Sequence, residues 1–443
     1  MTTSVKNEVN SVYGYVAAFL AGMIVGYRSI PELFGLIYVG LGVACIYLAT
    51  RQDLTRLFKI LPFLIYSEMF MRAYVSFIPY LFMPYLYIAI FGIMILSNGV
   101  KLKLHSNYVV FLLFFVFIEY INGFRSNDAD YARGLLINTT ALAVVALWGA
   151  TTVITPLMAN RILNTVKLAG IYLCGMVIIR YFKGEVYFSS YSQSEGVNGL
   201  APVQLSGYMG FVVTVFFFTI MNGFEKKNLL LNLICISMAT IIMLLSFSRG
   251  GIYFFGIMII LYSFFNRKQL HKYLFFILLI PTGLFVYNFV TAKTNGLIEE
   301  RYKEEGNSGR TYLVEAAWDL FLSHPLAGVG PGNFNTEITK DKLYDQESGA
   351  HNEFARAAAE DGILGVITYW GFFLFLFLDI MKRKPIQREY AFYFAVFFCL
   401  VIVHNGLKIS LQPLLILLAV ATPTIRASKN LHVTFSKKPT LQS

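Results

Sequence analysis

The sequence predicts an all-α, polytopic integral membrane protein, and three observations lead to this fold class. First, 57% of the 443 residues are hydrophobic and only 14% are charged, whereas soluble domains are roughly 25% charged. Second, aromatic residues make up 16% of the chain, as is typical of proteins whose outer surface contacts lipid. Third, long apolar runs recur from one end of the chain to the other. Together these observations exclude a soluble enzyme, a secreted disulfide scaffold and a disordered chain.

The apolar runs predict a bundle of about 12 to 14 transmembrane helices, since a helix crosses a bilayer with about 20 apolar residues. Runs of this length, or close to it, lie at 12–27, 30–49, 60–78, 80–98, 108–122, 135–152, 165–182, 203–222, 229–247, 250–266, 273–290, 362–381, 390–406 and 409–424. The smaller number applies if closely spaced runs are the two halves of one broken helix.

Basic residues mark every second connector between these runs. Arg51, Arg56 and Lys59 follow the second run, for example, and Arg383 and Lys384 follow the twelfth. Under the positive-inside rule these connectors, together with both termini, are expected in the cytoplasm. Membrane topology therefore explains the net charge of +11. A nucleic-acid partner is not expected, because phosphate binding needs cations gathered on one exposed surface.

The longest outward connector, residues 291–361, is acidic and has helical patterns of its own. It contains 13 of the 25 acidic residues of the chain. Apolar residues at helical spacing predict an amphipathic helix over 311–323, and GVGPGNF (328–334) predicts a tight glycine turn. A second helix is expected to start near His351 or Asn352. A folded connector of this length is unusual unless it has a function.

The chain is therefore predicted to have three parts. Residues 1–290 form a transmembrane bundle, residues 291–361 form the outward loop with its amphipathic helices and a catalytic motif, and residues 362–443 form C-terminal transmembrane helices with a basic tail.

Arg249 is the first candidate for anion binding. It lies in Ser-Arg-Gly-Gly (248–251), between two nearly adjacent apolar runs. Because an arginine stays charged, it must contact water, a lipid phosphate or a bound anion at the outer interface. The backbone amides of Gly250 and Gly251 would be open to the anion as well. The alternative is an arginine that extends to lipid headgroups.

Two further candidates lie in the outward connector. Arg310 opens the amphipathic helix, where a guanidinium group and a helix N-terminus both favour a phosphate; the alternative is a surface salt bridge with a preceding glutamate. His351, in Ala-His-Asn-Glu-Phe, has the imidazole of a usual general base, and Asn352 or Glu353 would orient its ring. The alternative is an ordinary loop histidine, and His324 is the competing candidate.

Charged residues within the runs give two more candidates. Arg180, near the outer end of the seventh run, is either a third anion ligand or an arginine that extends to the interface. Glu68 and Arg72 are spaced i, i+4, which favours a structural ion pair. The chain has no nucleotide-phosphate loop, no HExxH pair and no nucleophile elbow. We therefore expect no metal ion and no cofactor, and arginine would stabilise any anionic leaving group.

Three blocks of the sequence resemble a known family. They are SRGG (248–251), SGRTYLVEAAWDLFLSHPLAGVGPGNF (308–334) and AHNEFARAAAEDGILG (350–365). In this order they are similar to the C-terminal domain shared by bacterial O-antigen ligases and O-antigen polymerases. The resemblance covers roughly residues 200–380, whereas the N-terminal half is similar in hydropathy only.

The resemblance implies an all-helical membrane glycosyltransferase of the broad GT-C type with one large periplasmic loop. Its substrates would be a glycan on undecaprenyl diphosphate and an acceptor hydroxyl, joined by a metal-independent, inverting transfer in the periplasm. Arg249 and Arg310 would bind the diphosphate, with Arg180 as a further candidate, and His351 would be the catalytic residue. The residues that support the motif are Gly250, Gly328, Gly330 and Asn352.

Several functions remain open. The favoured prediction is ligation of O-antigen to lipid A–core in the bacterial inner membrane, with the active site facing the periplasm. Polymerisation of lipid-linked repeat units has the same motifs, and protein O-glycosylation is a third choice of acceptor. From a different class, a multi-span lipid or oligosaccharide transporter would need charged residues near the bilayer midplane and repeated halves. The expected partners are the undecaprenyl-diphosphate-linked donor, the lipid A–core or lipid-linked acceptor, and membrane lipids.

Overall fold

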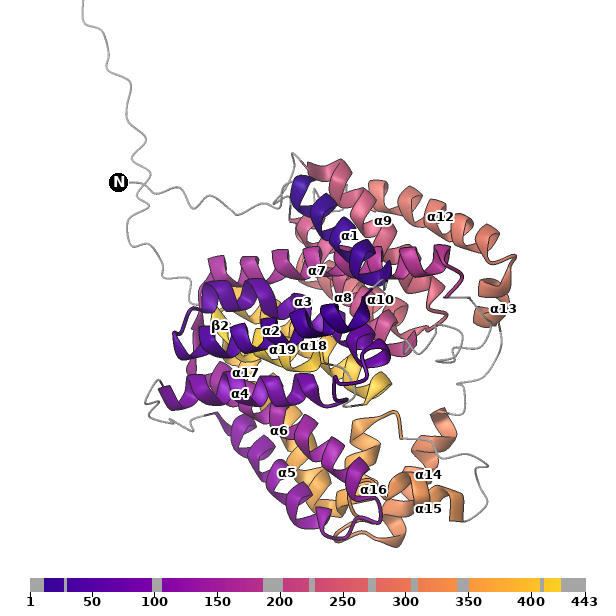
Figure 1. Ribbon diagram of the computed structural model, residues 1–443. Helices are drawn as coiled ribbons and strands as arrows, with labels where there is room; N and C mark the ends of the chain where they lie inside the picture. Colours follow the sequence, from indigo (N-terminus) through magenta and orange to yellow (C-terminus); the bar gives the residue numbers. More distant parts are fainter. Residues whose placement is uncertain are drawn as a thin grey trace, which may run out of the picture.

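The computed structural model describes residues 12–27, 30–97, 106–185, 202–222, 228–269, 276–303, 310–340, 350–406 and 410–423. Within these ranges the chain is a bundle of helices with one short pair of strands (Figure 1). The protein is a multi-pass helical membrane protein. The helices that are long and apolar enough to cross a bilayer are Pro31–Thr50, Ala129–Thr151, Leu157–Phe182, Pro202–Met221 and Glu353–Lys382.

Each of the predicted apolar runs forms a helix. The helices formed mainly by these runs are α1 (Val12–Tyr27), α2 (Pro31–Thr50), α3 (Leu54–Tyr74), α4 (Phe82–Ser97), α5 (Asn107–Gly123), α6 (Ala129–Thr151), α7 (Pro156–Phe182), α8 (Pro202–Met221), α9 (Leu229–Leu245), α10 (Gly250–Phe265), α12 (Phe276–Lys293), α17 (Gly371–Lys382), α18 (Pro385–Asn405) and α19 (Gln412–Val420). The twelfth run, 362–381, also includes residues of the two elements that precede α17. The other elements are α13 (Leu297–Lys303), α14 (Arg310–Ser323), α15 (Phe334–Lys340), α16 (Glu353–Gly365), the π-helical turn η3 (Val366–Trp370) and the parallel strands β1 (Val153–Ile154) and β2 (Thr422–Pro423).

Three of the helices that begin several residues before their apolar runs have side-chain caps. The side chains of Asp53, Asp128 and Thr155 accept backbone N–H bonds in the first turns of α3, α6 and α7. Such caps satisfy amides that have no partner within the helix. Hydropathy alone therefore places these helix starts too late.

The last apolar run forms a helix that is too short to span a bilayer. α19 has nine residues, all of them buried. At 1.5 Å per residue it is ~14 Å long, about half of the ~30 Å hydrocarbon core. It packs against α18 and α6, so it is an element of the core rather than a lipid-facing span.

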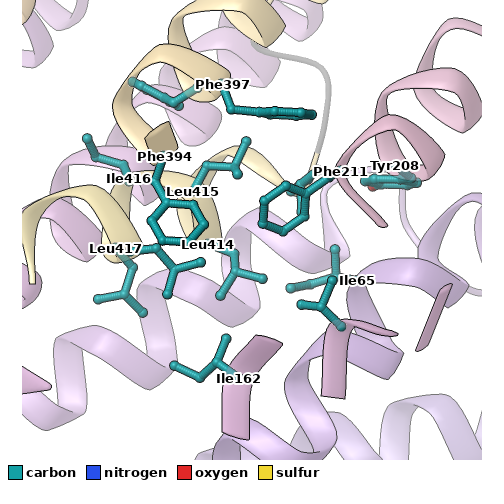
Figure 2. Packing of buried hydrophobic residues seen from close by; sticks show 14 of the residues in the cluster. Ile65, Ile162, Tyr208, Phe211, Phe394, Phe397, Leu414, Leu415, Ile416 and Leu417 are labelled. Atoms are coloured by element: carbon teal, nitrogen blue, oxygen red, sulfur yellow. The ribbon is translucent and has the colours of Figure 1, made fainter. Parts of the chain in front are cut away.

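The centre of the bundle is formed by α8, α18 and α19. Figure 2 shows Phe211 of α8 beside Phe394 and Phe397 of α18 and near Leu414 of α19. The ring centroids of Phe211 and Phe397 are 5.1 Å apart, and both side chains are fully buried. Peripheral helices instead expose large apolar side chains, such as Ile24 of α1 and Leu36 of α2, as expected for a surface that faces lipid.

The basic connectors gather on one face of the bundle. Arg161 in the first turns of α7 donates to Thr55 Oγ1 in the first turn of α3, at 3.3 Å. Arg383, after α17, donates to Ala419 O at the end of α19, at 2.8 Å. β1, which precedes α7, pairs with β2, which follows α19. Helix ends whose connectors are predicted to share one side of the membrane are thus in contact.

The predicted outward connectors meet one another at other helix ends. Lys183, after α7, donates to Tyr27 O at the end of α1, at 2.9 Å. Arg125, after α5, donates to Ala327 O in the 291–361 connector, at 2.8 Å. These contacts agree with the alternation of basic and non-basic connectors in the sequence.

The part of the 291–361 connector that contains α14, α15 and α16 folds at one end of the molecule, whereas α13 packs beside α12. Figure 1 shows α14, α15 and α16 together beside the end of α5. α14 agrees with the amphipathic helix predicted over 311–323, and α16 begins directly after Asn352, also as predicted. Leu313 and Ala317 of α14 pack with Phe334 and Ala359 in a small core of their own. The short helices α13 and α15 have no counterpart among the elements expected from the sequence.

Candidate functional site

The Ser-Arg-Gly-Gly segment forms a turn between α9 and α10 that is fixed to α8. Arg249 is the N-cap residue of α10, which begins at Gly250, and its side chain is half-buried. The Ser206 hydroxyl donates to Ser248 O at 2.9 Å and accepts a bond from Gly251 N at 2.9 Å. The hydrogen bonds of Ser206 therefore fix the turn that places Arg249 at the N-terminus of α10.

One expectation for this turn is wrong. The amide of Gly251 is not open to an anion, because it donates to Ser206. A Cβ atom at Gly251 would overlap Ser206 O, so the glycine serves the close approach of α8 to α10. The Arg249 guanidinium group and the Gly250 amide are the anion-binding candidates that remain here.

A histidine that the sequence analysis did not single out lies against this turn. A Cβ atom added to Gly250 would be 2.6 Å from Cε1 of His404, so the imidazole rests on the backbone next to Arg249. Nδ1 of His404 is 2.7 Å from Asn405 Oδ1. The ring also makes an edge contact with Phe254, with centroids 5.5 Å apart. A polar pair at the end of an apolar run is the sequence signal that points to it.

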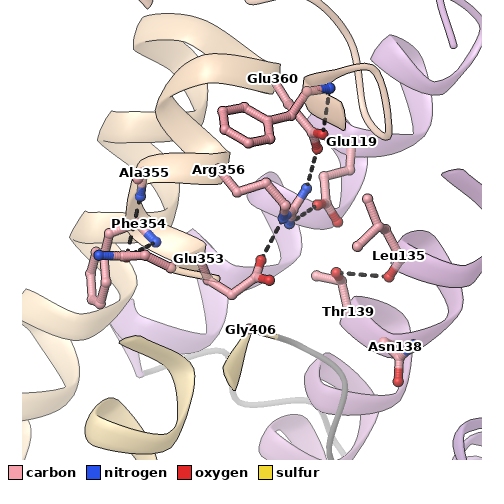
Figure 3. Close-up of polar contacts among 12 residues, drawn as sticks. Glu119, Leu135, Asn138, Thr139, Glu353, Phe354, Ala355, Arg356, Glu360 and Gly406 are labelled. Atoms are coloured by element: carbon pink, nitrogen blue, oxygen red, sulfur yellow. Dashed lines mark hydrogen bonds and ion pairs between the residues drawn. The ribbon is translucent and has the colours of Figure 1, made fainter. Parts of the chain in front are cut away.

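The residue after this pair contacts the Ala-His-Asn-Glu-Phe segment. Gly406 ends α18 with a φ of 65°, and a Cβ atom there would be 2.9 Å from Glu353 Oε1. Figure 3 shows Gly406 beside Glu353. Residues 404–406 therefore lie between the turn that holds Arg249 and the start of α16, two residues after His351.

His351 has a backbone conformation that is uncommon for a non-glycine residue. Its φ is 51°, in the left-handed region, where histidine is enriched but most residues are strained. The next residue, Asn352, caps α16: its Oδ1 accepts bonds from Phe354 N at 3.0 Å and Ala355 N at 3.4 Å. The cap fixes the direction of the chain at the half-buried His351.

Arg356 joins the first turns of α16 to α5, as Figure 3 shows. Its guanidinium group bonds to Glu353 at 2.5 Å, Glu360 at 2.7 Å and Glu119 of α5 at 2.6 Å. All four side chains are buried. Acids at i−3 and i+4 from an arginine are visible in the sequence, but Glu119 belongs to a distant run and is paired only by the fold. This cluster sets the position of the segment that begins with His351.

The predicted glycine turn is confirmed, and it packs against the middle of α16. Gly328 and Gly330 have φ values of 62° and 99°, which favour glycine. Gly330 N donates to Glu360 O at 2.8 Å, and a Cβ atom at Gly328 would overlap the same backbone. Arg125 donates to Gly328 O at 2.8 Å. The turn thus ties α16 to the end of α5.

Arg310 and His324 lie at opposite ends of α14. Arg310 is the first residue of the helix, as predicted, and its side chain lies outside what the structure describes. Leu313, one turn later, belongs to the same small core as Ala350, the residue before His351. His324 follows the last residue of α14, is exposed, and lies 3.0 Å from Ser323 Oγ through its Nδ1.

Arg180 is engaged within the bundle. It is 1% exposed, its guanidinium carbon lies 3.6 Å from the centroid of the Tyr74 ring, and Nη1 is 3.3 Å from Glu185 Oε2. An anion at Arg180 would have to compete with Glu185, and this role stays a prediction. The structural pair predicted for Glu68 and Arg72 is confirmed, with a distance of 3.0 Å between Oε1 and Nη1.

Acidic residues at D-x-D spacing near this end of the molecule have structural partners. Asp128 caps α6, and Asp130 pairs with Arg133 at 2.8 Å. In the described ranges, no group of three or more His, Cys, Asp or Glu side chains has a geometry that could hold a metal ion. The contacts of residues 404–406 are instead with Gly250, which follows Arg249, and with the carboxylate of Glu353.

The comparison with known families agrees with the resemblance seen in the sequence. Residues 231–370 match the family model described as O-antigen ligase. The matched range contains the Ser-Arg-Gly-Gly turn, Arg310 and His351. No curated protein matches the chain.

Proposed function

From the O-antigen ligase match we propose that the protein transfers a glycan from undecaprenyl diphosphate to an acceptor hydroxyl. The matched family implies glycosyl transfer with lipid-linked glycans by a bacterial-type, multi-pass membrane protein. One observation supports the proposed site best: residues 404–406 contact both Gly250, next to Arg249, and Glu353, two residues after His351.

The proposed reaction is a single displacement at the anomeric carbon. The acceptor oxygen forms a bond to this carbon while the bond to the diphosphate oxygen breaks, so the configuration inverts. His351 takes the proton of the attacking hydroxyl, and general-base assistance of this kind contributes typically about 10²–10⁴-fold. The electron pair of the broken bond leaves with undecaprenyl diphosphate. No metal ion takes part in this scheme.

Arginine would stabilise the leaving group. Negative charge grows on the diphosphate as the glycosidic bond breaks, and fixed cations in a partly dehydrated site stabilise such charge most strongly in the transition state. Arg249, held by the Ser206 bonds to its turn, and Arg310, at the N-terminus of α14, are the proposed ligands. Arg180 would act only if the anion displaced Glu185.

The proposed orientation follows the charge of the connectors. The face that contains Arg161 and Arg383 would lie in the cytoplasm with both termini. α14 to α16 would then lie in the periplasm, above the bacterial inner membrane. This arrangement suits a substrate whose polyprenyl chain stays in the bilayer while its diphosphate and glycan reach the periplasmic face.

Among acceptors, lipid A–core is the one we favour, so that the reaction is O-antigen ligation. Extension of lipid-linked repeat units is the alternative, and protein glycosylation is a third. Deletion of the gene separates the first two: loss of a ligase leaves the core without any O-antigen, whereas loss of a polymerase leaves one repeat unit on the core.

Purified protein with a lipid-linked glycan and acceptor tests the proposal. Arg249→Ala should lower the transfer rate by about 10²–10³-fold, and Arg310→Ala and His351→Ala should lower it as well. The controls are Arg267→Ala, beyond the other end of α10, and His324→Ala at the end of α14, and both should keep the wild-type rate. EDTA should have no effect.

Two results would contradict the proposal. Wild-type transfer by all three site variants would refute the residue assignment. A protein that moves lipid-linked glycan across a vesicle membrane but forms no covalent product would be the transporter instead.

A further inference from the structure

A groove of about 690 Å³ lies between α14 and the start of α16, next to His351. It is lined by Glu315, Trp318 and Asp319 on one side and by Asn352, Phe354 and Trp370 on the other. Its volume is within the range of about 300–1,000 Å³ found for ligand sites. Asn352 directly follows His351, so the groove opens beside the proposed general base.

Two of the three tryptophans of the chain line this groove. Trp318 is 50% exposed and Trp370 is 43% exposed, whereas Trp148 is 1% exposed. The indole N–H of Trp370 donates to Phe354 O at 3.4 Å, and their rings meet edge to face. Trp370 ends the π-helical turn η3, a distortion frequent at functional sites. The groove therefore has large aromatic surfaces held in defined positions.

The polar groups of the groove are acidic. Glu315 and Asp319 lie one turn apart on α14 and are exposed, and none of the described residues that line the groove is basic. Two carboxylates repel a phosphate or another anion. Apart from Asn352, the rest of the lining is apolar, so a lipid chain is the competing occupant.

We propose that the groove binds the sugar rings of the acceptor, an inference that rests on the proposed glycosyl transfer. A sugar ring has an apolar face of C–H groups and hydroxyl donors around its edge. The apolar face fits the indole surfaces of Trp318 and Trp370, and the hydroxyl groups donate to Glu315 and Asp319. Apolar walls with a few polar groups at fixed positions are the usual composition of such sites.

The faces of α16 assign the groove to the acceptor rather than the donor. Phe354 and Ala358 line the groove. Glu353 and Arg356 belong to the buried cluster on the opposite side, and Glu353 contacts Gly406 in the segment that reaches Arg249. The residues next to Arg249 and the groove therefore lie on different sides of α16, with His351 before its N-terminus. Arg310, at the start of α14, is the proposed diphosphate ligand on the helix that also lines the groove.

Tryptophan fluorescence gives a binding measurement that needs no catalysis. The probe is a neutral hexose oligosaccharide of the outer core, titrated into the purified full-length protein in nanodiscs without donor. We expect a saturable change in emission. Trp318→Phe with Trp370→Phe should abolish it, since only the buried Trp148 remains. Glu315→Gln with Asp319→Asn keeps both reporters and should weaken binding about 10-fold.

Leu322→Ala is the matched control, because Leu322 is an exposed apolar residue of α14 that does not line the groove. It should bind the oligosaccharide as the wild type does. In transfer assays Trp318→Ala should raise the KM for the acceptor about 10-fold and leave the KM for the donor unchanged.

Three outcomes would overturn the proposal. Absence of any emission change with oligosaccharide is the first, and quenching of Trp318 and Trp370 by brominated phospholipid chains, with no protection by oligosaccharide, is the second. A rise in the donor KM alone in Trp318→Ala is the third. Binding is measured without donor, so its result does not depend on the proposed reaction. His351→Ala should lose transfer and keep normal oligosaccharide binding, so that the groove and the reaction are tested separately.

Discussion

Gly250 has no side chain, and this allows residues 404–406 to lie against the turn that holds Arg249. The imidazole of His404 occupies the space in which a Cβ atom would lie, 2.6 Å from Cε1. The sequence suggests a different use for this glycine, a backbone amide open to an anion. The contact with His404 adds a steric reason, which depends on α18 passing the end of α10. Gly406 has the same relation to Glu353.

Gly250→Ala tests this contact, with Gly256→Ala in the same helix as its control. The added methyl group would displace His404, at a cost of about 1–3 kcal/mol for overpacking, and transfer activity should fall. Gly256 has nothing within 4 Å of its Cβ position, so its variant should be as stable as the wild type or more stable by up to about 1 kcal/mol. Thermal unfolding in detergent and the transfer rate report both effects. Equal behaviour of the two variants would show that His404 is not held against Gly250.

α16 is placed by contacts at three points along its length. Asn352 caps its start, Arg356 bonds it to Glu119 of α5, and the glycine turn packs against it near Glu360. A helix with both apolar and buried charged contacts is fixed in rotation as well as in position, since each buried acceptor needs its donor. This is why the segment that contains His351 can be held firmly although it belongs to a long connector.

Arg356→Ala should destabilise the protein strongly. It would leave Glu119, Glu353 and Glu360 buried without their shared cation, and breaking a buried ion pair costs about 3–5 kcal/mol. The control is Arg133→Ala, which removes an exposed pair with Asp130 and should cost less than about 1 kcal/mol. Thermal unfolding of both variants in one detergent makes the comparison. A loss for Arg356→Ala no larger than that of the control would mean that the cluster does not hold α16.

The bundle as a whole has two chemically different ends. Basic connectors meet at one end, through Arg161 and Arg383, and α14 to α16 of the acidic connector lie together at another (Figure 1). Between them, α8 and α19 are almost entirely buried, while α1 and α2 expose apolar side chains. Under the positive-inside rule this distribution of charge predicts one orientation, with the basic end in the cytoplasm.

Labelling of introduced cysteines tests this orientation. Glu315→Cys on α14 and Lys382→Cys at the end of α17 are both at exposed positions. In spheroplasts a membrane-impermeant maleimide should label the first, and the second only after permeabilisation. Three of the four native cysteines, Cys45, Cys174 and Cys235, are buried, and Cys399 in α18 is partly exposed. The protein without introduced cysteines therefore gives the background. Labelling of Lys382→Cys but not Glu315→Cys in intact spheroplasts would invert the topology and remove the periplasmic site.

The sequence by itself determined the features that depend on neighbouring residues. Apolar runs became helices, the 311–323 pattern became α14, and GVGPGNF became a turn with glycines at positive φ, because helix periodicity and left-handed glycine are local properties of the chain. The three motif blocks are likewise contiguous strings, so the O-antigen ligase resemblance could be read directly and its range includes the matched residues 231–370.

Only the tertiary structure decided which distant side chains meet. The contact of His404 with Gly250, the bond between Glu119 and Arg356, and the groove between Trp318 and Trp370 all join separate helices. Hydropathy identifies a buried face but not its partner, because many helix pairings bury the same apolar area. The choice among them is made by side-chain packing and by the need to pair each buried polar group, and both conditions exist only once the helices are assembled.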